Sequence, residues 1–312
     1  MSVVVVGAGL AGVACAREVA DAGIPVRVLD RGRAPGGRMA SRCHDGRPID
    51  TGAAYFTVRD PEFAEVVADW RTAGLARPWT SELAVLDHGE RLRAPGPMRW
   101  AAPRGLCSLV AALAEGLPLE LGHEVKRVTS GPRVDGEPAD VVVLAMPDPQ
   151  ALRVLDPGLG AVALASGRPW RPVLAVAAEY AERTWAELPA AFVNDHPVLS
   201  LIADDGARRG DDAPVLVAHT VSDVARRFDE QPEEAVPLVV EAVGELLGIT
   251  ARPVWTHAHR WRFASPEQDR DVPFHLGADG IGLAGDGWGS SRIETAWRSG
   301  SLLGREVVRR LG

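Results

Sequence analysis

The first residues whose types and spacing indicate chemistry are three glycines near the start of the chain. Gly7, Gly9 and Gly12 form a G-x-G-x-x-G pattern directly after the apolar run Val3–Val6 and before a segment with helical spacing. Gly7 allows a tight turn, Gly9 lets the backbone approach a pyrophosphate, and Gly12 lets the helix pack close to the strand. Because the positive end of that helix would face phosphates, the pattern predicts a dinucleotide-binding turn. A glycine turn without a ligand is the alternative.

Two features that follow the first turn bear on which dinucleotide is bound. Asp30 ends the second predicted strand, Val26–Leu29, where an acid binds a ribose hydroxyl of the adenosine. The segment Gly36–Met39 reads Gly-Gly-Arg-Met and adds backbone donors and a cation beside the diphosphate. It resembles the second signature of FAD proteins of the glutathione-reductase type and favours FAD over NAD. A surface loop with an incidental arginine is the alternative.

A third signature lies close to the end of the chain. The segment Gly282–Asp286 is an apolar strand ending in Gly-Asp, and a helix is expected from about Arg292 onward. In FAD proteins of this class the aspartate holds the ribityl chain or the pyrophosphate, and the following helix directs its positive end at the flavin pyrimidine. Asp286 serving only as a helix cap is the alternative, but the three signatures occur in the order typical of an FAD site.

Helices and strands must position these turns, and the spacing of apolar residues predicts both. Helices are expected over Ala11–Ala22, Asp60–Arg71, Leu106–Leu113, residues 234–247 and from about Arg292 to the end. Strands are expected at Val3–Val6, Val26–Leu29, residues 118–128 and 140–145, Val173–Glu179, Val198–Ala203, Val215–Thr220, residues 253–263 and Ile281–Ala284. Residues 82–100 resemble a hairpin that turns at Asp87–Gly89.

The dinucleotide-type pattern occurs at the start, in the middle and at the end of the chain, so the cofactor domain is expected to be discontinuous. Segments rich in proline and glycine near residues 94–105 and 156–172 are the expected crossings. We expect an FAD-binding domain of residues 1–78, 101–160 and 277–312. The expected substrate domain comprises residues 79–100 and 161–276.

Composition restricts the partners and the compartment. The chain has 312 residues, 46% of them hydrophobic, and a formal net charge of −8, which argues against sequence-independent nucleic-acid binding. The cysteines, Cys15, Cys43 and Cys107, are too few and scattered for a disulfide framework or a zinc cluster. No apolar stretch approaches the roughly 20 residues of a membrane span. Charged residues interrupt the apolar start of the chain, which argues against a signal peptide. We expect a soluble cytoplasmic protein whose partners are small molecules.

With these motifs the chain resembles the bacterial renalase-like FAD oxidases, within the amine-oxidase-like flavoproteins. The resemblance spans nearly the full length and lies in Gly7–Gly12, Gly36–Arg42, Asp50–Thr57, Met98–Trp100, His259–Trp261, Gly285–Asp286, Arg292–Glu294 and Ser299–Gly300. The D-x-G-A-x-Y-F-T segment at Asp50–Thr57 and the terminal Gly-Asp block discriminate best. The connection between Thr129 and Asp140 departs from the pattern, because it is shorter than the β-meander common in such flavoproteins.

The resemblance implies an α/β fold, with a Rossmann-like FAD-binding domain of the glutathione-reductase/p-hydroxybenzoate-hydroxylase type and a smaller mixed-sheet α+β substrate domain. It implies noncovalent FAD and oxidation of dihydropyridine isomers of NAD(P)H. In that reaction a hydride passes from the misreduced ring to flavin N5, giving NAD(P)+, and O2 reoxidises the flavin, giving H2O2. The residues expected to bind FAD are Gly7, Gly9, Leu10, Ala11, Gly12, Asp30, Arg31, Gly37, Arg38, Met39, Ala54, Tyr55, Phe56, Val125, Gly285, Asp286, Arg292, Ile293 and Glu294.

Hydride loss from a dihydropyridine makes its ring aromatic, so positioning of the ring should supply most of the catalysis and no catalytic base is expected. The residues expected to shape the pocket are Tyr55, Trp288, His259 and Arg260. Each has an alternative: Tyr55 as packing beneath the ring, Trp288 as a turn anchor, and the other two as strand residues paired with acids.

Arg99 and the pair of His257 and His259 are two further candidate sites. Arg99 either binds a substrate phosphate or pairs with a surface acid. His257 and His259 share one face of a strand, but no third ligand is near them in sequence, so we expect no metal.

An amine oxidase or desaturase-like enzyme acting on another metabolite is the first rival reading. Amine oxidases usually place a lysine near flavin N5 and often a pair of tyrosines around the amine. Here Lys126 is the only lysine, and Tyr55 and Tyr180 are the only tyrosines. Covalent attachment of flavin through a C-terminal cysteine is excluded because Cys107 is the last cysteine.

A non-catalytic FAD- or NAD-binding module is the second rival, and a peroxide assay separates it from an enzyme. The preferred isomer, the NAD or NADP form and the oligomeric state stay open.

Overall fold

The computed structural model describes residues 1–87 and 90–312, and its chain divides into two compact units. The first unit comprises Met1–Met39, Cys107–Trp170 and Ser265–Gly312. The second comprises Ala40–Leu106 and Arg171–Ala264. Each unit is therefore built from segments that are distant in sequence.

These boundaries differ from the expected domain limits in four segments, two in each unit. Residues 40–78 and 101–106 lie in the second unit, because β5 (Phe56–Thr57) pairs with β7 (Glu90–Ala101). Residues 161–170 and 265–276 lie in the first unit. There, β18 (His275–Leu276) pairs with β19 (Ile281–Leu283), and α5 (Gly160–Ala165) packs against β19.

A six-stranded sheet with the order β18-β19-β12-β1-β2-β8 forms the centre of the first unit. Its remaining strands are β1 (Val3–Val6), β2 (Val26–Asp30), β8 (Leu119–Leu121) and β12 (Val141–Leu144). The strands run parallel except β18, which is antiparallel to β19. Every residue of β1 and β12 is buried, as expected for parallel strands covered on both faces.

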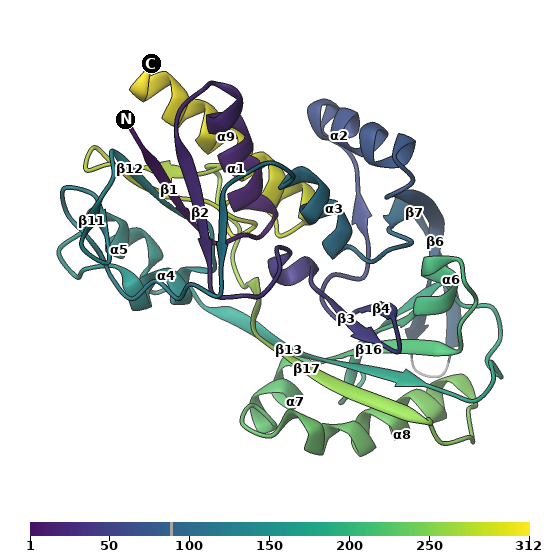
Figure 1. The fold of residues 1–312 in the computed structure, drawn as a ribbon. Helices are drawn as coiled ribbons and strands as arrows, with labels where there is room; N and C mark the ends of the chain where they lie inside the picture. The colour runs from purple at the N-terminus through teal and green to yellow at the C-terminus, as the bar shows by residue number, and fades with distance from the viewer. Residues whose placement is uncertain (88–89) are drawn as a thin grey trace. The chain divides into compact units, whose positions relative to one another are not determined.

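Helices cover one face of this sheet, and a small sheet with two short helices covers the other (Figure 1). The first face carries α1 (Leu10–Asp21) and α9 (Ile293–Leu311), which pack along each other, and α3 (Cys107–Leu113) lies beside α1. The second face carries the strands β9 (Val128–Thr129), β10 (Arg133–Val134) and β11 (Glu137–Pro138) and the helices α4 (Asp148–Val154) and α5.

The small sheet explains the short connection noted in the sequence. Between Thr129 and Asp140 the chain forms a reduced meander, in which β9, β10 and β11 pair antiparallel in strands of two residues. Val128 and Val134 are buried in the core beneath it. The single strand expected over residues 118–128 is wrong, because strand structure is interrupted between β8 and β9.

The second unit contains an eight-stranded mixed sheet with the order β17-β13-β16-β15-β14-β6-β7-β5. Its further strands are β6 (Arg77–Asp87), β13 (Trp170–Glu179), β14 (Ala190–Val193), β15 (Leu199–Asp204), β16 (Val215–Thr220) and β17 (Trp255–Pro266). A hairpin of β3 (Ser41–His44) and β4 (Arg47–Asp50) stands apart from this sheet. The other elements are η1 (Gly37–Met39), α2 (Pro61–Thr72), α6 (Asp205–Arg209), α7 (Ser222–Arg227), η2 (Pro232–Ala235) and α8 (Val236–Leu247), of which η1 belongs to the first unit.

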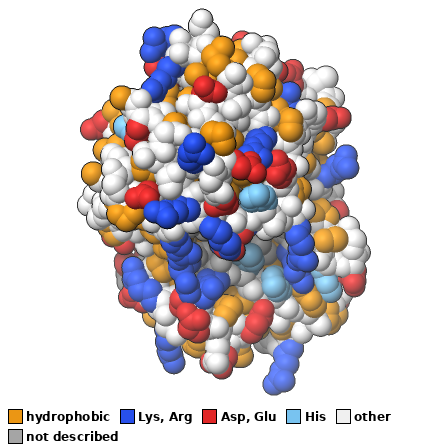
Figure 2. All heavy atoms as spheres, turned by 60° about the vertical axis from the view of Figure 1, so that its left-hand side comes forward, with side chains coloured by type: hydrophobic (Ala, Val, Ile, Leu, Met, Phe, Trp, Pro, Cys, Tyr) orange, Lys and Arg blue, Asp and Glu red, His pale blue; other side chains and the backbone are white. Residues whose placement is uncertain are grey.

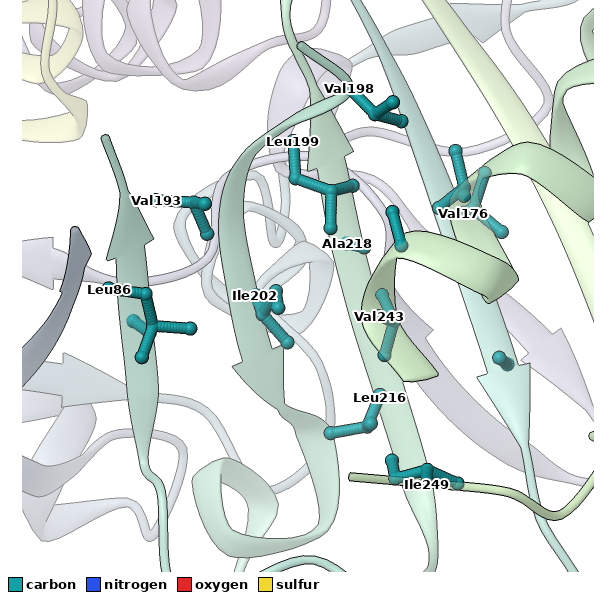
Figure 3. Close-up of a cluster of buried hydrophobic side chains, with 14 of the residues drawn as sticks. Leu86, Val176, Val193, Val198, Leu199, Ile202, Leu216, Ala218, Val243 and Ile249 are labelled. Carbon is teal, nitrogen blue, oxygen red and sulfur yellow. The ribbon is translucent and has the colours of Figure 1, made fainter. Parts of the chain in front are cut away.

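The core of the second unit lies between α8 and the sheet. Val243 of α8 is buried with Ile202 of β15 and with Leu216 and Ala218 of β16 (Figure 3). The two strands are near-continuous apolar runs, which predicted them in the sequence. Successive residues of β16 enter different cores, since Val215 and Val217 belong to a second buried cluster. The expected hairpin is present as β6 and β7, while its turn at Asp87–Gly89 includes residues 88 and 89, which lie outside the described part of the chain.

Candidate functional site

The first glycine turn connects β1 to α1 and has room only for glycine at two positions. Gly7 has φ +114°, and a Cβ there would lie 2.5 Å from the carbonyl oxygen of Ala145. A Cβ on Gly12 would overlap the carbonyl oxygen of Gly7. Helix α1 starts at Leu10 without a side-chain cap and without an acid in its first turn. Its first N–H groups are thus suited to an anion.

Asp30, at the end of β2, is tied to this turn. Its Oδ2 accepts a hydrogen bond from the backbone N–H of Ala8 at 2.6 Å, and its Oδ1 accepts one from Gly32 at 2.6 Å. Each carboxylate oxygen keeps a further lone pair for a hydroxyl donor. The next residue, Arg31, is exposed.

The second glycine turn packs directly on the first. The N–H of Gly36 donates to the carbonyl of Ala8 at 2.9 Å. A Cβ on Gly37, which has φ +57°, would lie 3.1 Å from the Cα of Gly9. The two turns that the sequence singled out therefore form one surface of backbone, and Met39 behind it is buried.

The third turn follows β19 and is linked to the second turn by an ion pair. Arg38 donates two hydrogen bonds to the carboxylate of Asp286, one of them at 2.9 Å, and Ser291 donates a third at 2.5 Å. Asp286 does not cap α9, because the N-cap residue is Arg292, which has no capping side-chain bond. A Cβ on Gly285 would meet no atom within 4 Å.

Close packing of α1 against α9 positions the starts of both helices. A Cβ on Gly300 would overlap the carbonyl oxygen of Ala11, and one on Gly304 would lie 2.7 Å from the carbonyl oxygen of Cys15. Because α1 and α9 follow parallel strands of one sheet, their N-termini lie at the same sheet edge. Ile293 and the buried Glu294 form the first turn of α9.

A buried network that sequence reasoning missed supports the third turn. Asp148 is 4% exposed and accepts hydrogen bonds from Arg270 at 3.0 and 3.1 Å and from the indole N–H of Trp170 at 3.2 Å. Arg270 also donates to the carbonyl of Gly287 at 2.8 Å. The one sequence feature that could have pointed to Asp148 is the Asp-Pro pair at the start of α4. Such a pair is also typical of an ordinary helix start, so it does not indicate a buried network.

Trp288 is buried in the core of the first unit and not on an open surface. The guanidinium of Arg270 lies 4.1 Å from the centroid of its ring, and the ring of His275 stacks on it with the centroids 6.4 Å apart. This packing supports the alternative in which Trp288 anchors the turn. Val125 belongs to the same core, so its side chain is engaged in packing.

In the second unit, the segment Asp50–Thr57 is held through its own backbone. Arg208 donates to the carbonyl of Ala54 at 2.8 Å and to that of Asp50 at 3.2 Å. The indole N–H of Trp261 donates to the carbonyl of Thr51 at 2.7 Å. The backbone of the Asp50–Thr57 motif is therefore held by hydrogen bonds from residues more than 150 positions away.

The clamp is part of a buried ionic cluster on α6. Arg208 and Arg209 both pair with Asp205, and Arg209 also pairs with the carboxylate of Asp50 at 3.0 Å. Burial raises the pKa of Asp205, but the guanidinium groups of Arg208, Arg209 and Arg47 outweigh it and hold that pKa below its usual range. Sequence reasoning missed these residues because Asp205–Arg209 reads as a polar turn.

Tyr55 and Phe56 occupy different surroundings although they are neighbours. The ring of Tyr55 lies 6.3 Å from that of Trp79, and the guanidinium of Arg99 lies 5.5 Å from the Tyr55 ring centroid. Phe56 is 2% exposed and packs among the rings of Phe63, Trp70 and Trp100. The side chain of Phe56 is thus part of the core, which leaves only its backbone for a ligand.

Alternate residues of β17 form a row of rings. Trp255, His257, His259 and Trp261 follow one another with centroid distances of 6.1, 6.3 and 4.3 Å. Burial lowers the pKa of His259, and the charges of His257, Arg42 and Arg260 lower it further. The ring of His259 is therefore neutral near pH 7.

Arg260 points to the other face of the strand, because successive residues alternate. It donates to the carbonyl of Asp229 and lies 3.5 Å from the carboxylate of that residue. This pairing supports the alternative in which Arg260 is a strand residue neutralised by an acid.

Two negative findings concern other kinds of site. In residues 1–87 and 90–312, no cluster of three or more His, Cys, Asp or Glu side chains is arranged to hold a metal ion. Over the same residues, no helix combines the length and the apolar character needed to cross a bilayer.

Two family models match the chain. The model for flavin-containing amine oxidoreductases matches residues 72–307, and a model for NAD(P)-binding Rossmann-like domains matches residues 5–70. Together they account for the glycine turn at the start and for most of the remaining chain.

Curated relatives match over parts of their length. A coproporphyrinogen III oxidase of Mycobacterium leprae is 27% identical over 163 residues, which are 51% of this chain and 36% of that protein. A hydroxyneurosporene desaturase of Rubrivivax gelatinosus is 46% identical over 57 residues, which are 18% of this chain and 11% of that protein. The match thus covers about a third or less of each relative.

Solved structures share the fold over the whole chain. A putrescine oxidase bound to putrescine superimposes with a TM-score of 0.78 at 16% identity, covering 99% of this chain and 100% of that one. Cyclohexylamine oxidase of Brevibacterium oxydans IH-35A gives a TM-score of 0.78 at 16% identity, with 99% of both chains covered. The expected fold, a Rossmann-like domain with a second mixed-sheet domain, is confirmed.

The turns of the first unit fit the cofactor of this family. Backbone N–H groups at the start of α1 suit the pyrophosphate, the carboxylate of Asp30 suits ribose hydroxyls, and glycines leave room for the backbone to approach. The expectation of FAD is confirmed by the family match.

Proposed function

The chain belongs to the family of flavin-containing amine oxidoreductases, and from this membership we propose that it is a renalase-like oxidase of dihydropyridine isomers of NAD(P)H. Bound FAD supplies the acceptor for a hydride and passes its electrons to O2. The net reaction consumes a dihydropyridine, O2 and a proton, and it yields NAD(P)+ and H2O2. The nicotinamide dinucleotide and O2 are thus the proposed partners, with noncovalent FAD and a cytoplasmic location.

The observation that carries the proposal over amine oxidation is the distribution of lysine. Lys126 is the only lysine, and its Nζ bonds to Glu124 on an exposed part of the first unit. The second unit has no lysine to place near a flavin. Oxidation of an amine commonly depends on such a group, whereas a dihydropyridine becomes aromatic as it loses a hydride.

We assign the following roles to the chain's own residues. The start of α1 binds the pyrophosphate, Asp30 binds a ribose, and Asp286 with Arg38 holds the chain between the phosphates and the flavin ring. Tyr55 and the neutral ring of His259 offer flat, uncharged surfaces that position a planar substrate. Hydride transfer then needs orientation and exclusion of water more than a base.

Anaerobic mixing of the purified yellow protein with separate NADH isomers tests the proposal. We expect the flavin absorbance near its visible maximum to bleach within one turnover, and readmitted O2 to restore it with an equivalent amount of H2O2. Bleaching by primary amines but by none of the isomers would favour an amine oxidase. A flavin that no reductant of either kind bleaches would favour a binding module.

A further inference from the structure

Arg99 is a buried cation without a counter-ion in the described part of the chain. The residue, on β7, is 7% exposed. The hydrogen bond of its Nη1 to the carbonyl of Pro97 is long, at 3.4 Å. Its Nε is buried and has no hydrogen-bond partner among the described residues. The guanidinium therefore keeps donor capacity for an acceptor that the chain does not provide.

Two other buried arginines of the same unit are paired with acids. Arg208 and Arg209 are 1% and 5% exposed, and each forms an ion pair with a buried carboxylate. A buried charge is costly unless it is paired. The missing anion at Arg99 is thus an exception within its own unit.

The surroundings of Arg99 suit an anion attached to a flat ring. Its guanidinium lies 5.5 Å from the centroid of the Tyr55 ring, which lies 6.3 Å from the ring of Trp79. Thr57 on β5 is the direct partner of Arg99 in the sheet, so its hydroxyl is on the same face. Gly96 provides space, because a Cβ there would lie 3.0 Å from Nη2.

We propose that Arg99, with Tyr55 as the adjoining flat surface, binds an anionic group of the substrate, namely a phosphate of a dinucleotide. The choice of phosphate rests on the proposed function, whereas the anionic character of the ligand rests on the unpaired guanidinium alone. A cationic amine would be repelled from this position. Arg99 thereby becomes a residue that selects phosphate-bearing substrates.

Binding of inorganic pyrophosphate to the FAD-loaded protein tests the site without turnover. We compare wild type, Arg99→Gln, Arg99→Lys and the control Arg93→Gln by titration calorimetry. Arg93 lies on the same strand, but its side chain is 83% exposed and pairs with Glu82 at 3.1 Å. We expect a Kd at least tenfold weaker in Arg99→Gln, an intermediate value in Arg99→Lys and an unchanged value in Arg93→Gln.

Three outcomes would overturn the site. They are a wild type that does not bind pyrophosphate, an Arg99→Gln variant that binds it as wild type does, and an Arg99→Gln variant that loses FAD. The last outcome would assign Arg99 to the cofactor. Melting temperatures distinguish loss of the charge from disturbed packing. If Arg99→Lys and Arg99→Gln melt at the same temperature but only Arg99→Lys retains pyrophosphate binding, the charge is what binds the anion.

Steady-state kinetics separates the site from the proposed function. For a dihydronicotinamide dinucleotide, Arg99→Gln should raise KM at least tenfold with little change in kcat. For the corresponding dihydronicotinamide riboside, which lacks phosphate, KM should stay the same. If neither compound is oxidised by wild type, the proposed function fails, while the pyrophosphate titration still decides the role of Arg99.

Discussion

At the scale of single residues, the ion pair of Asp286 and Arg38 is the contact that holds the third turn. The pair joins the second glycine turn to the turn after β19, so it brings together two signatures nearly 250 positions apart. Charge-assisted bonds of this kind are short and directional. The pair therefore orients the turn as well as neutralising two charges.

Asp286→Asn should weaken FAD binding while keeping the shape of the side chain. Loss of the charge leaves Arg38 without its carboxylate, at a cost of about 1.5–3 kcal/mol, which corresponds to at least a tenfold higher Kd for FAD. Fluorescence titration of the apoprotein measures it. Asp279→Asn, in the turn before β19, is the matched control. Full retention of FAD by Asp286→Asn would remove Asp286 from the cofactor site.

Tyr55→Phe should change turnover without changing FAD content. The aromatic ring, which packs against Trp79 and Arg99, is retained, and only the hydroxyl is lost. Stopped-flow reduction and the ratio of flavin to protein absorbance measure the two quantities. Equal loss of both would place Tyr55 in the cofactor shell instead.

At the scale of elements, α1 and α9 are the pair whose closeness matters most. Glycines at the contact allow backbone to touch backbone, and both helices start at the sheet edge that carries the turns. Neither helix has a side-chain cap at its start. Small residues thus let the first turn of α1 pack closely against the middle of α9.

Gly300→Ala should destabilise the protein by about 1–3 kcal/mol, because the added methyl group overlaps the carbonyl of Ala11. FAD affinity should fall as well, since the helices must move apart. Urea unfolding and FAD titration measure the two effects. Gly160→Ala is the control, because a Cβ there meets no atom within 4 Å. An unchanged midpoint in Gly300→Ala would show that the helices adjust freely.

The whole molecule is acidic and is built from two discontinuous units. On the face shown in Figure 2, arginine side chains lie among acidic ones and several histidines. Its stability should depend on pH through buried groups, because these differ most between the folded and unfolded chain. His219 and Asp205 are the clearest cases.

The free energy of unfolding should fall as pH falls below about 6.5. Burial, aided by the charge of Arg208, lowers the pKa of His219 to about 4, so the unfolded chain binds this proton first. Asp205 adds a further loss as pH falls below about 4, since its folded-state pKa is lowered. Urea unfolding from pH 7 to pH 4 measures the slope.

His219→Gln should remove about 1–3 kcal/mol of this decline between pH 6.5 and pH 4. His123→Gln is the control, because the His123 side chain is 40% exposed. An identical slope in wild type and His219→Gln would mean that other groups cause the acid sensitivity.

Local patterns in the sequence determined much of the first unit. Backbone sterics act between residues close together in the chain, so the glycines at Gly7 and Gly12 predicted a turn that other side chains would obstruct. The strands and helices with clear periodicity were also predicted, among them β1, α1 and α9. The order of three signatures predicted FAD, which the family match bears out.

Only the tertiary structure decided which charges meet. The ion pair of Asp148 with Arg270 and the hydrogen bond of Arg208 to Ala54 each join residues from separate parts of the chain. The folded chain also leaves the Nε of Arg99 buried without a hydrogen-bond partner among the described residues. Packing likewise buries the side chains of Phe56 and Trp288, whose expected roles at the site stay predictions. A residue's type states which bonds it can make, but the folded chain determines whether a partner is within a few ångströms.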